Sequence, residues 1–377
     1  MSNGTSVRVA AVELSRLELT LDVPMLTSAG THARRPLLLV RVETDEGVGY
    51  GECSALLEPH YTEEYADGAE LVLAEHLLPR LAERASFEDA AAAMAHLAVV
   101  RGHRMAKAAI EMALLDAELR AGGISLAEHL GASTATVLAG ANLGIGEPEV
   151  VLDAVAAVAA LGYRRVKCKI APGHDVEIVV AVRDAFPDLV VSVDANGAYD
   201  LGNAEHLTAL EQLDGLGLAA IEQPLGPDDL LGHARLAALL ETPIVLDESI
   251  PSAAVLEVAL ELGACDGVSV KTARLGGIEI ARRVHDRCVE VGVHLSIGGM
   301  LESGVGRAAA LAVAAMPGFD LPGDLGASDR YFATDLTRPH ELDEGRLAVP
   351  SGPGLGVVPD EDVVGTLRVR SRTFISS

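Results

Sequence analysis

The spacing of hydrophobic and polar positions changes near residue 135. Residues 7 to about 55 contain β-rich runs, VRVAAVELSRLEL and PLLLVRVETDEG, separated by glycine-containing turns, which predict antiparallel strands. Helical segments are expected next, at 62–83 and 103–121. In the second of these the apolar positions recur every three or four residues, which indicates an amphipathic helix. Strands followed by helices predict a small α+β domain.

From residue 135 onwards, short β-rich runs alternate with helical segments. The strand candidates are TVLAGANLGI, RRVKCKI, VVSVDAN, LAAIEQP, PIVLDES, GVSVKTA and VHLSIGG, with a weak eighth near 319–325. Helices are expected between them at 148–160, 174–186, 203–213, 228–240, 252–262, 276–291 and 303–315. This alternation favours a (β/α) barrel. An open doubly wound sheet is the second interpretation, but it would not bring five successive strand ends into one site.

The same patterns divide the chain into three segments. We expect an α+β domain at 1–130, a barrel at 131–335 and a C-terminal segment at 336–377. The last segment is rich in glycine and proline and is expected to pack back on the first domain.

Composition narrows the classes of partner. The 377-residue chain has a formal net charge of −26, which argues against nucleic acid and anionic membrane surfaces as partners. Its four cysteines form no CxxC pair, so neither a zinc site nor a disulfide framework is indicated. No apolar run approaches the length of a membrane span, and the N-terminus lacks the pattern of a secretory signal. These features predict a cytoplasmic protein with no membrane partner.

Five ionisable residues recur at intervals of one βα unit, each at the trailing end of a strand candidate. They are Lys169, Asp194, Glu222, Asp247 and Lys271. A (β/α) barrel collects the carboxyl ends of its strands at one face, so these side chains are expected to meet there.

The three carboxylates suggest a metal site. Carboxylate oxygens without histidine or cysteine favour Mg²⁺ or Mn²⁺ over zinc. Acidic residues at strand ends also cap the following helices, but three in register with lysines on both sides make capping the weaker account. Asn196 and Glu248 are expected to position the ligands.

The lysines suggest acid–base chemistry. Lys167 and Lys169 point to the same side of their strand and Cys168 to the other. Two adjacent ammonium groups would lower each other's pKa, and a lysine with a lowered pKa can abstract a proton. A pair of surface lysines fits the spacing equally well. With a metal between them, Lys169 and Lys271 would reach opposite faces of a small carboxylate substrate, which predicts removal of its α-proton.

The motifs VKCKI, VDAN, IEQP, LDES and SVKTARLGG resemble the enolase superfamily, in its muconate-lactonising branch, over essentially the whole chain. The segments GGMLESGVGRA (298–308) and LPGDLGASDRYF (321–332) are most similar to the group containing o-succinylbenzoate synthases and N-succinylamino acid racemases. The resemblance implies a modified TIM barrel, (β/α)₇β, with the first domain and the tail as its cap. It also implies a homo-oligomer.

The resemblance assigns roles to the residues. Asp194, Glu222 and Asp247 would be the metal ligands, Lys169 the principal base and Lys271 its partner. Lys167 would help to hold the metal-bound carboxylate of the substrate.

One set of residues serves two reactions in this group. In the synthase, a dehydratase of menaquinone biosynthesis, one lysine removes the α-proton and protonates the departing hydroxyl, while Lys271 stabilises charge. In the N-acylamino acid racemase both lysines exchange protons with one α-carbon. The synthase with racemase capacity is our first hypothesis, and racemisation as the main activity is the close alternative. A barrel retained for binding or structure is the third, and loss of any of the five residues would have indicated it.

Three further sets of residues are candidates for specificity. Arg274 resembles an arginine that accompanies racemase capability and would lower the pKa of Lys271, although a structural arginine fits equally well. Substrate selection is expected from loops near 21–31 and 53–61, with the barrel side closed by Gly298, Gly299, Met300 and Leu301. His60 and Tyr61 are candidates for substrate contact, although a loop histidine is more often simply exposed.

Overall fold

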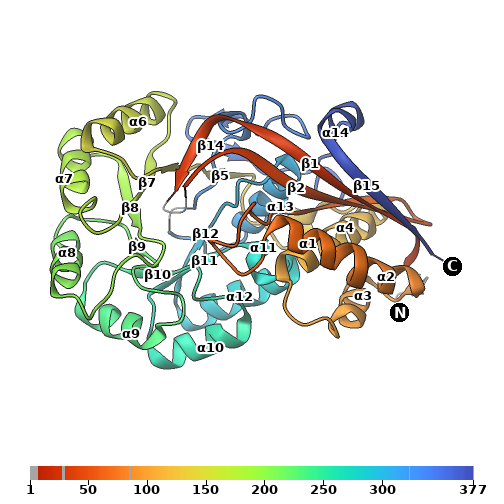
Figure 1. Ribbon diagram of the computed structural model, residues 1–377, viewed down its shortest axis with the longest axis horizontal. Helices are drawn as coiled ribbons and strands as arrows, with labels where there is room; N and C mark the ends of the chain where they lie inside the picture. The colour runs from red at the N-terminus through yellow and green to blue at the C-terminus, as the bar shows by residue number, and fades with distance from the viewer. Residues whose placement is uncertain (1–6, 28–29, 85, 322, 377) are drawn as a thin grey trace.

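The computed structural model describes residues 7–27, 30–84, 86–321 and 323–376. Two regions lie side by side in Figure 1. One is a curled parallel sheet surrounded by helices, and the other is an antiparallel sheet packed against a long helix.

The antiparallel sheet belongs to the cap and has the order β15-β1-β2-β3. A short strand β4 also pairs with β1. The C-terminal strand β15 lies along β1, with register from Ala11 opposite Ile375 to Leu17 opposite Arg368. The strands are β1 (Val7–Thr27), β2 (Gly30–Thr44), β3 (Val48–Cys53), β4 (Ser86–Phe87) and β15 (Arg368–Ile375).

The cap helices pack on this sheet, and glycine permits the closest approach. A Cβ added at Gly49 or Gly51 would lie 2.0 Å from a backbone oxygen of α4, so only glycine fits there. The segment expected as one helix at 62–83 is two helices joined by a π-helical turn at Leu73–Leu77, and α3 was not predicted. The helices are α1 (Ala66–Val72), α2 (Leu78–Glu83), α3 (Ala90–Leu97), α4 (Arg104–Gly122) and α5 (Leu126–His129).

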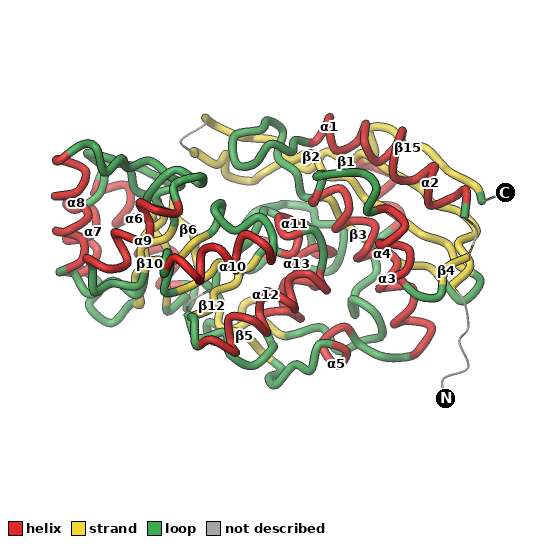
Figure 2. Tube along the Cα trace, turned by 90° about the horizontal axis from the view of Figure 1, so that it is seen from below, coloured by secondary structure: helices red, strands yellow, loops and turns green. Residues whose placement is uncertain are grey.

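The parallel sheet contains seven strands in chain order, from β6 to β12. They are β6 (Ala141–Leu143), β7 (Arg165–Lys169), β8 (Val190–Asp194), β9 (Ile221–Glu222), β10 (Ile244–Leu246), β11 (Gly267–Val270) and β12 (His294–Ile297). Helices follow the strands and cover the outside of the curl (Figures 1 and 2). They are α6 (Pro148–Ala160), α7 (Val176–Ala185), α8 (Ala204–Asp214), α9 (Leu230–Leu239), α10 (Ala253–Leu262), α11 (Thr272–Leu275), α12 (Ile278–Val291) and α13 (Gly304–Ala314).

The weak eighth strand expected near 319–325 is not a regular strand in the described part of that segment. Its backbone nevertheless bonds to both edges of the curl. The Asp324 N–H donates to the Ile297 carbonyl at 2.7 Å, and the Gly140 N–H donates to the Leu325 carbonyl at 3.0 Å. The segment therefore links β12 to the residues before β6, and the predicted modified barrel with an α+β cap is confirmed.

Residues near the domain junctions form a small sheet of their own. The first barrel strand expected at 136–145 is divided into β5 (Thr136–Leu138) and β6. β5 pairs with β14 (Arg346–Ala348), which pairs with β13 (Leu342–Asp343). A 3₁₀ turn (Ser328–Arg330) and α14 (Glu361–Leu367) complete the elements that are described. The exact domain boundaries stay a prediction.

Apolar side chains, mostly Ala, Val and Leu, form two buried clusters, one centred on the barrel and one in the cap. All four cysteines lie in the described ranges, where they are free and buried. None of the helices in those ranges combines the length and apolarity that crossing a bilayer requires.

Candidate active site

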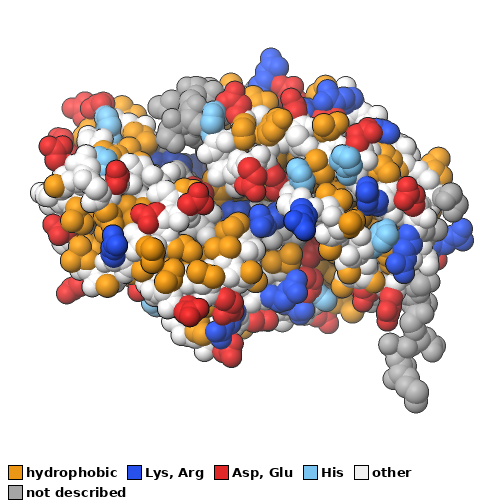
Figure 3. Space-filling view, turned by 60° about the horizontal axis from the view of Figure 1, so that its bottom comes forward, with side chains coloured by type: hydrophobic (Ala, Val, Ile, Leu, Met, Phe, Trp, Pro, Cys, Tyr) orange, Lys and Arg blue, Asp and Glu red, His pale blue; other side chains and the backbone are white. Residues whose placement is uncertain are grey.

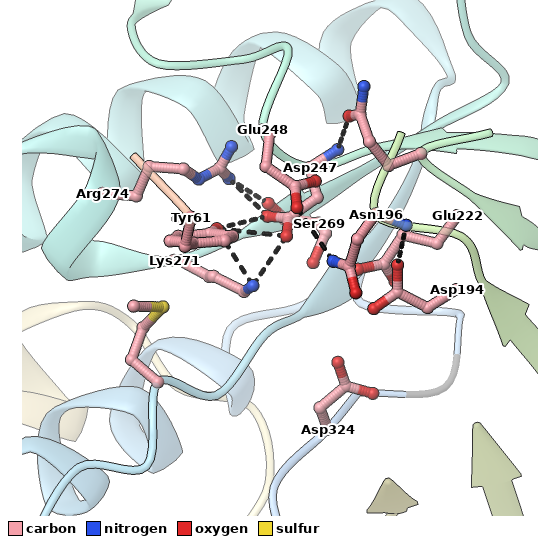
Figure 4. A network of polar contacts seen from close by, with 12 residues as sticks. Tyr61, Asp194, Asn196, Glu222, Asp247, Glu248, Ser269, Lys271, Arg274 and Asp324 are labelled. Atoms are coloured by element: carbon pink, nitrogen blue, oxygen red, sulfur yellow. Dashed lines mark hydrogen bonds and ion pairs between the residues drawn. The ribbon is translucent and has the colours of Figure 1, made fainter. Parts of the chain in front are cut away.

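The structure brings the five spaced ionisable residues together at the carboxyl ends of β7 to β11. Lys169, Asp194 and Glu222 end their strands, and Asp247 and Lys271 directly follow theirs. Figure 4 shows Asp194, Glu222, Asp247 and Lys271 arranged around one space. Parallel strands place their carboxyl ends at one face, which is why the sequence spacing produced this convergence.

On the β7 side, two lysines contact the carboxylates. Lys167 Nζ donates to Glu222 Oε2 at 2.8 Å and lies 3.5 Å from Asp194 Oδ2. Lys169 Nζ donates to the same oxygen of Asp194 at 3.0 Å. Both lysines therefore point into the site, as predicted, while Cys168 between them is buried on the other side.

Burial and neighbouring charges shift the pKa values of the ionisable groups on the β7 side. Burial lowers the pKa of Lys167, but Asp324 and Glu222 raise it to well above its ordinary range, so the expected lowering by a neighbouring lysine is not found for Lys167. Burial raises the pKa of Asp194, yet Lys169 and Lys167 outweigh it and hold that pKa below its usual value. Burial raises the pKa of Glu222 to about 8.

Asn196 and Glu248 form a bridge between β8 and β10. The Asn196 side-chain amide donates to Glu248 Oε1 at 2.9 Å, and its backbone N–H donates to Asp194 Oδ1 at 3.0 Å. Lys169 also donates to the amide oxygen of Asn196. Asn196 has a left-handed backbone, φ 42°, which asparagine tolerates better than most residues. Burial, with the nearby charge of Asp247, raises the pKa of Glu248 to about 7.

On the β11 side, a cap residue closes over the lysine. Lys271 Nζ donates to Asp247 Oδ2 at 2.7 Å and to the Tyr61 hydroxyl at 3.0 Å. The Tyr61 hydroxyl donates to Asp247 Oδ1 at 3.0 Å, and its ring centroid lies 4.5 Å from Lys271 Nζ. Tyr61 is therefore part of the site and the cap supplies it.

Arg274 contacts the carboxylate that pairs with Lys271. It is buried on α11, lies 3.3 Å from Asp247 Oδ1 and donates to the backbone oxygens of Ile250 and Ser269. Burial lowers the pKa of Lys271, but Asp247 raises it to well above its ordinary value. Arg274 also lowers the pKa of Asp247, and its expected effect on the pKa of Lys271 stays a prediction.

The loop at 298–301 closes the barrel side. A Cβ at Gly298 would lie 2.2 Å from Cε of Lys271, so the absence of a side chain leaves room for the lysine. Gly299, Met300 and Leu301 line the cavity. The backbone oxygens of Met300 and Leu301 accept hydrogen bonds from buried Arg35 of β2, at 2.9 and 3.0 Å. The cap therefore also fixes this loop.

Sequence reasoning missed three residues of the site. Asp324 accepts a hydrogen bond from Lys167 at 2.5 Å and lies 3.6 Å from Arg165. Gln223 accepts the backbone N–H of Asp247 at 3.0 Å and so holds that residue in place. Arg35 is the third. Asp324 and Gln223 stand inside the motifs LPGDLG and IEQP, which was the available signal.

A cavity of about 230 Å³ opens onto these groups from between cap and barrel. His60 lines it but has a half-exposed side chain, so its role in substrate contact stays a prediction. Leu21 lines it too, whereas residues 28 and 29 of the expected loop at 21–31 lie outside the described residues. The cap-side lining is Leu21, Arg34, Arg35, Pro36, Leu56, Leu57, Glu58, His60 and Tyr61.

The donor set fits a divalent metal by its chemistry. Asp194, Glu222 and Asp247 supply carboxylate oxygens only, and the buried Glu222 Oε1 has no hydrogen-bond partner among the described residues. Within those residues, however, no three His, Cys, Asp or Glu side chains are already arranged closely enough to hold an ion. Ammonium groups lie between the carboxylates instead, and they would have to move aside for a cation.

Two family descriptions match the chain. "Mandelate racemase / muconate lactonizing enzyme, N-terminal domain" matches residues 10–131, and "Enolase C-terminal domain-like" matches residues 149–363.

Full-length relatives carry two activities in their names. The chain is 49% identical over 358 residues to an N-succinylamino acid racemase of Amycolatopsis, covering 94% of this chain and 95% of that protein. It is 41% identical over 355 residues to an o-succinylbenzoate synthase of Geobacillus kaustophilus, covering 93% of each. A crystal structure of an enolase superfamily member from Listeria innocua superposes with a TM-score of 0.93 at 37% identity, covering 98% of this chain and 100% of that one.

Proposed function

The chain belongs to the mandelate racemase / muconate lactonizing enzyme family of the enolase superfamily, and from that membership we propose that it removes the proton α to a carboxylate. Its main reaction is the dehydration that forms o-succinylbenzoate, and it also racemises N-succinylamino acids. The observation that carries this proposal is the position of two lysines, Lys169 and Lys271, on either side of three convergent carboxylates.

The proposed roles follow from the contacts. Lys169, on the more exposed side of the site, takes the α-proton and returns it to the leaving hydroxyl in the dehydration. Lys271 places a second ammonium group opposite, where it stabilises negative charge or exchanges a proton from the other face. Lys167 is fixed by Glu222 and Asp324 and presents positive charge to the substrate carboxylate.

Asp194, Glu222 and Asp247 would hold Mg²⁺, or Mn²⁺ in its place. Such an ion supplies positive charge next to the carboxylate whose α-proton is removed. The unpartnered Glu222 Oε1 supports this assignment. Asn196 and Glu248 hold the side chains of Asp194 and Lys169 in position relative to each other.

Racemisation is a close second candidate for the main activity. The relative that is 49% identical is named a racemase, and several that are 37–41% identical are named synthases. The same two lysines serve both reactions, so identity alone does not rank them. A place in menaquinone biosynthesis, a cytoplasmic location and a homo-oligomeric state remain parts of the proposal.

The test is to run both substrates on one preparation, with Mg²⁺ and after treatment with a chelator. We expect dehydration of the hydroxycyclohexadiene carboxylate, and incorporation of solvent deuterium into both enantiomers of an N-succinylamino acid, each lost with the chelator and restored by Mg²⁺. If neither substrate reacts in the presence of metal, the proposed function is wrong. Activity that survives complete removal of the metal would overturn the assignment of the three carboxylates.

A further inference from the structure

A second cavity, separate from the active site, lies where the cap meets the barrel helices. Its volume is about 480 Å³, within the range of ordinary small-molecule sites. The turn before α4, the first turn of α10 and the segment from Leu275 to Arg283 contribute its walls. It shares no lining residue with the active-site cavity.

The lining of this second cavity, called the groove below, is positively charged, whereas the chain as a whole is negatively charged. Its lining contains Arg101, Arg104, Lys107 and Arg283 and no acidic residue, although Asp and Glu outnumber Lys and Arg by 55 to 29 in the sequence. Figure 3 shows several blue Lys and Arg side chains near the middle of its view, with red Asp and Glu side chains close by.

These cations make few direct ion pairs among the described residues, although Glu64 lies near Lys107 and Glu111 near Arg283. In the described part of the chain, neither Arg101 nor Arg283 has an ion pair or a side-chain hydrogen bond, and Arg104 has one long contact, 3.7 Å, to the exposed Glu63. Lys107 donates only to the backbone oxygen of Val100. Burial and, to a smaller extent, the neighbouring Arg104 lower the pKa of Lys107, and Glu64 opposes them in part.

The backbone holds this arrangement in place. Gly102 and His103 are consecutive left-handed residues, with φ of 66° and 51°, and they turn the chain between Arg101 and Arg104. A Cβ at Gly276 would lie 3.4 Å from Cβ of Arg104, so the arginine stem packs across the turn after α11. Apolar residues between the cations, including Ala253, Leu275 and Ile280, offer a surface to an uncharged part of a ligand.

We propose that this groove binds a small organic phosphate that carries at least two negative charges. Guanidinium groups bind phosphate oxygens in pairs, and three arginines with a lysine can neutralise two phosphate groups. The long-range repulsion by a chain of net charge −26 is screened over about 10 Å at moderate salt, so the local cations decide the affinity.

The experiment measures binding of adenosine 5′-diphosphate and of inorganic pyrophosphate by calorimetry, without divalent cations, to the intact protein. We expect saturable binding with a Kd below about 1 mM, weakening as salt is added. If pyrophosphate binds as tightly as the nucleotide, the phosphate groups account for the affinity. If the nucleotide binds more tightly than pyrophosphate, the apolar wall contributes as well. Citrate is the carboxylate comparison, and we expect it to bind more weakly.

The Arg101→Gln/Arg283→Gln double variant should lose about tenfold or more in affinity. Both residues are exposed and outside the proposed active site, so turnover should be unchanged and serves as the check on folding. Arg235→Gln, an exposed arginine on α9, is the matched control and should bind like the wild type. Equal affinity in the double variant, or no saturable binding by the wild type, would overturn the proposal. The proposal would also be overturned if the wild type bound no phosphate and the double variant differed from it in oligomeric mass in solution. The groove would then be a contact between copies of the chain.

Discussion

Lys169 and Lys271 lie on two sides of one carboxylate cluster, but different parts of the molecule hold them. Lys169 contacts Asp194 and Asn196, both from the barrel, and its side chain is 20% exposed. Lys271 is 8% exposed and contacts Asp247 from the barrel and Tyr61 from the cap. The barrel alone therefore positions one lysine, whereas the other depends on both domains.

This difference suggests how one scaffold serves two reactions. A dehydration needs one mobile base with access to the leaving group, which suits the more open Lys169. Racemisation also needs a second base at a fixed distance on the opposite face, which suits an enclosed Lys271. Changes in the cap should therefore act on racemisation more than on dehydration.

The largest effect should come from Lys169→Ala. We expect loss of both reactions by about a thousandfold or more, because Lys167, the other lysine on that side, is held by Glu222 and Asp324, which raise its pKa well above the ordinary range. Steady-state rates with both substrates, and circular dichroism as the check on folding, provide the measurement. Retention of a tenth of either activity would mean that the barrel-held lysine is not the principal base.

The fold could be predicted because its signals are local and repeated. Each βα unit carries its own apolar strand and helical periodicity, and α6 lies at the predicted 148–160. The segment 319–325 carries only a weak strand pattern, because its backbone bonds to two strand edges without forming a regular ladder. The π-helical turn at 73–77 could not be predicted from the sequence either, since its apolar spacing resembles that of an ordinary helix.

The site was predictable as far as it depends on strand ends. The convergence of Asp194, Glu222 and Asp247 could be predicted because they recur along the sequence at intervals of one βα unit, each at the end of a strand. Tyr61 was named only as a candidate for substrate contact, and Arg35 on β2 was missed, because no spacing relates a cap residue to a barrel strand. The contact of Arg274 with Asp247 depends on side-chain direction that a four-residue helix does not fix in advance.

Lys271→Arg should separate the two reactions. Arginine keeps the positive charge but cannot be deprotonated in a protein, so it can stabilise charge and cannot act as a base. We expect racemisation to fall by about a hundredfold or more and dehydration by about tenfold. Measuring both rates on one preparation makes each the control for the other. An equal loss in both would show that Lys271 has the same role in the two reactions.

Tyr61→Phe should have a smaller effect confined to the Lys271 side. The change removes a hydroxyl that donates to Asp247 and accepts from Lys271, while the ring over the ammonium group remains. Hydrogen bonds to charged groups contribute about 1.5–3 kcal/mol, so the rate should fall by at least about tenfold. Deuterium exchange should slow for the enantiomer whose proton faces Lys271 and stay unchanged for the other. Equal slowing of both enantiomers would contradict the assignment of Tyr61 to one lysine.

The smallest effect concerns the attachment of the cap itself. Glu111 of α4 accepts the backbone N–H groups of Ile278 and Glu279, at 2.5 and 2.9 Å, and so caps the barrel helix α12. Burial raises the pKa of Glu111 from 4.5 to about 7. Between these values the folded protein holds a proton that the unfolded chain has released, so this contribution to stability is complete below pH 4.5 and is lost as the pH rises through 7.

Glu111→Gln should therefore flatten the fall in the free energy of unfolding between pH 5 and pH 8, by no more than about 3 kcal/mol, since one pKa unit corresponds to about 1.4 kcal/mol. The amide group of glutamine also faces an N–H donor, so the variant should be less stable at every pH. General repulsion in a chain of net charge −26 affects wild type and variant alike, and Glu261→Gln on the exposed face of α10 controls for the lost charge. If wild type and Glu111→Gln lose stability in parallel with rising pH, the buried carboxylate of Glu111 does not carry the pH dependence.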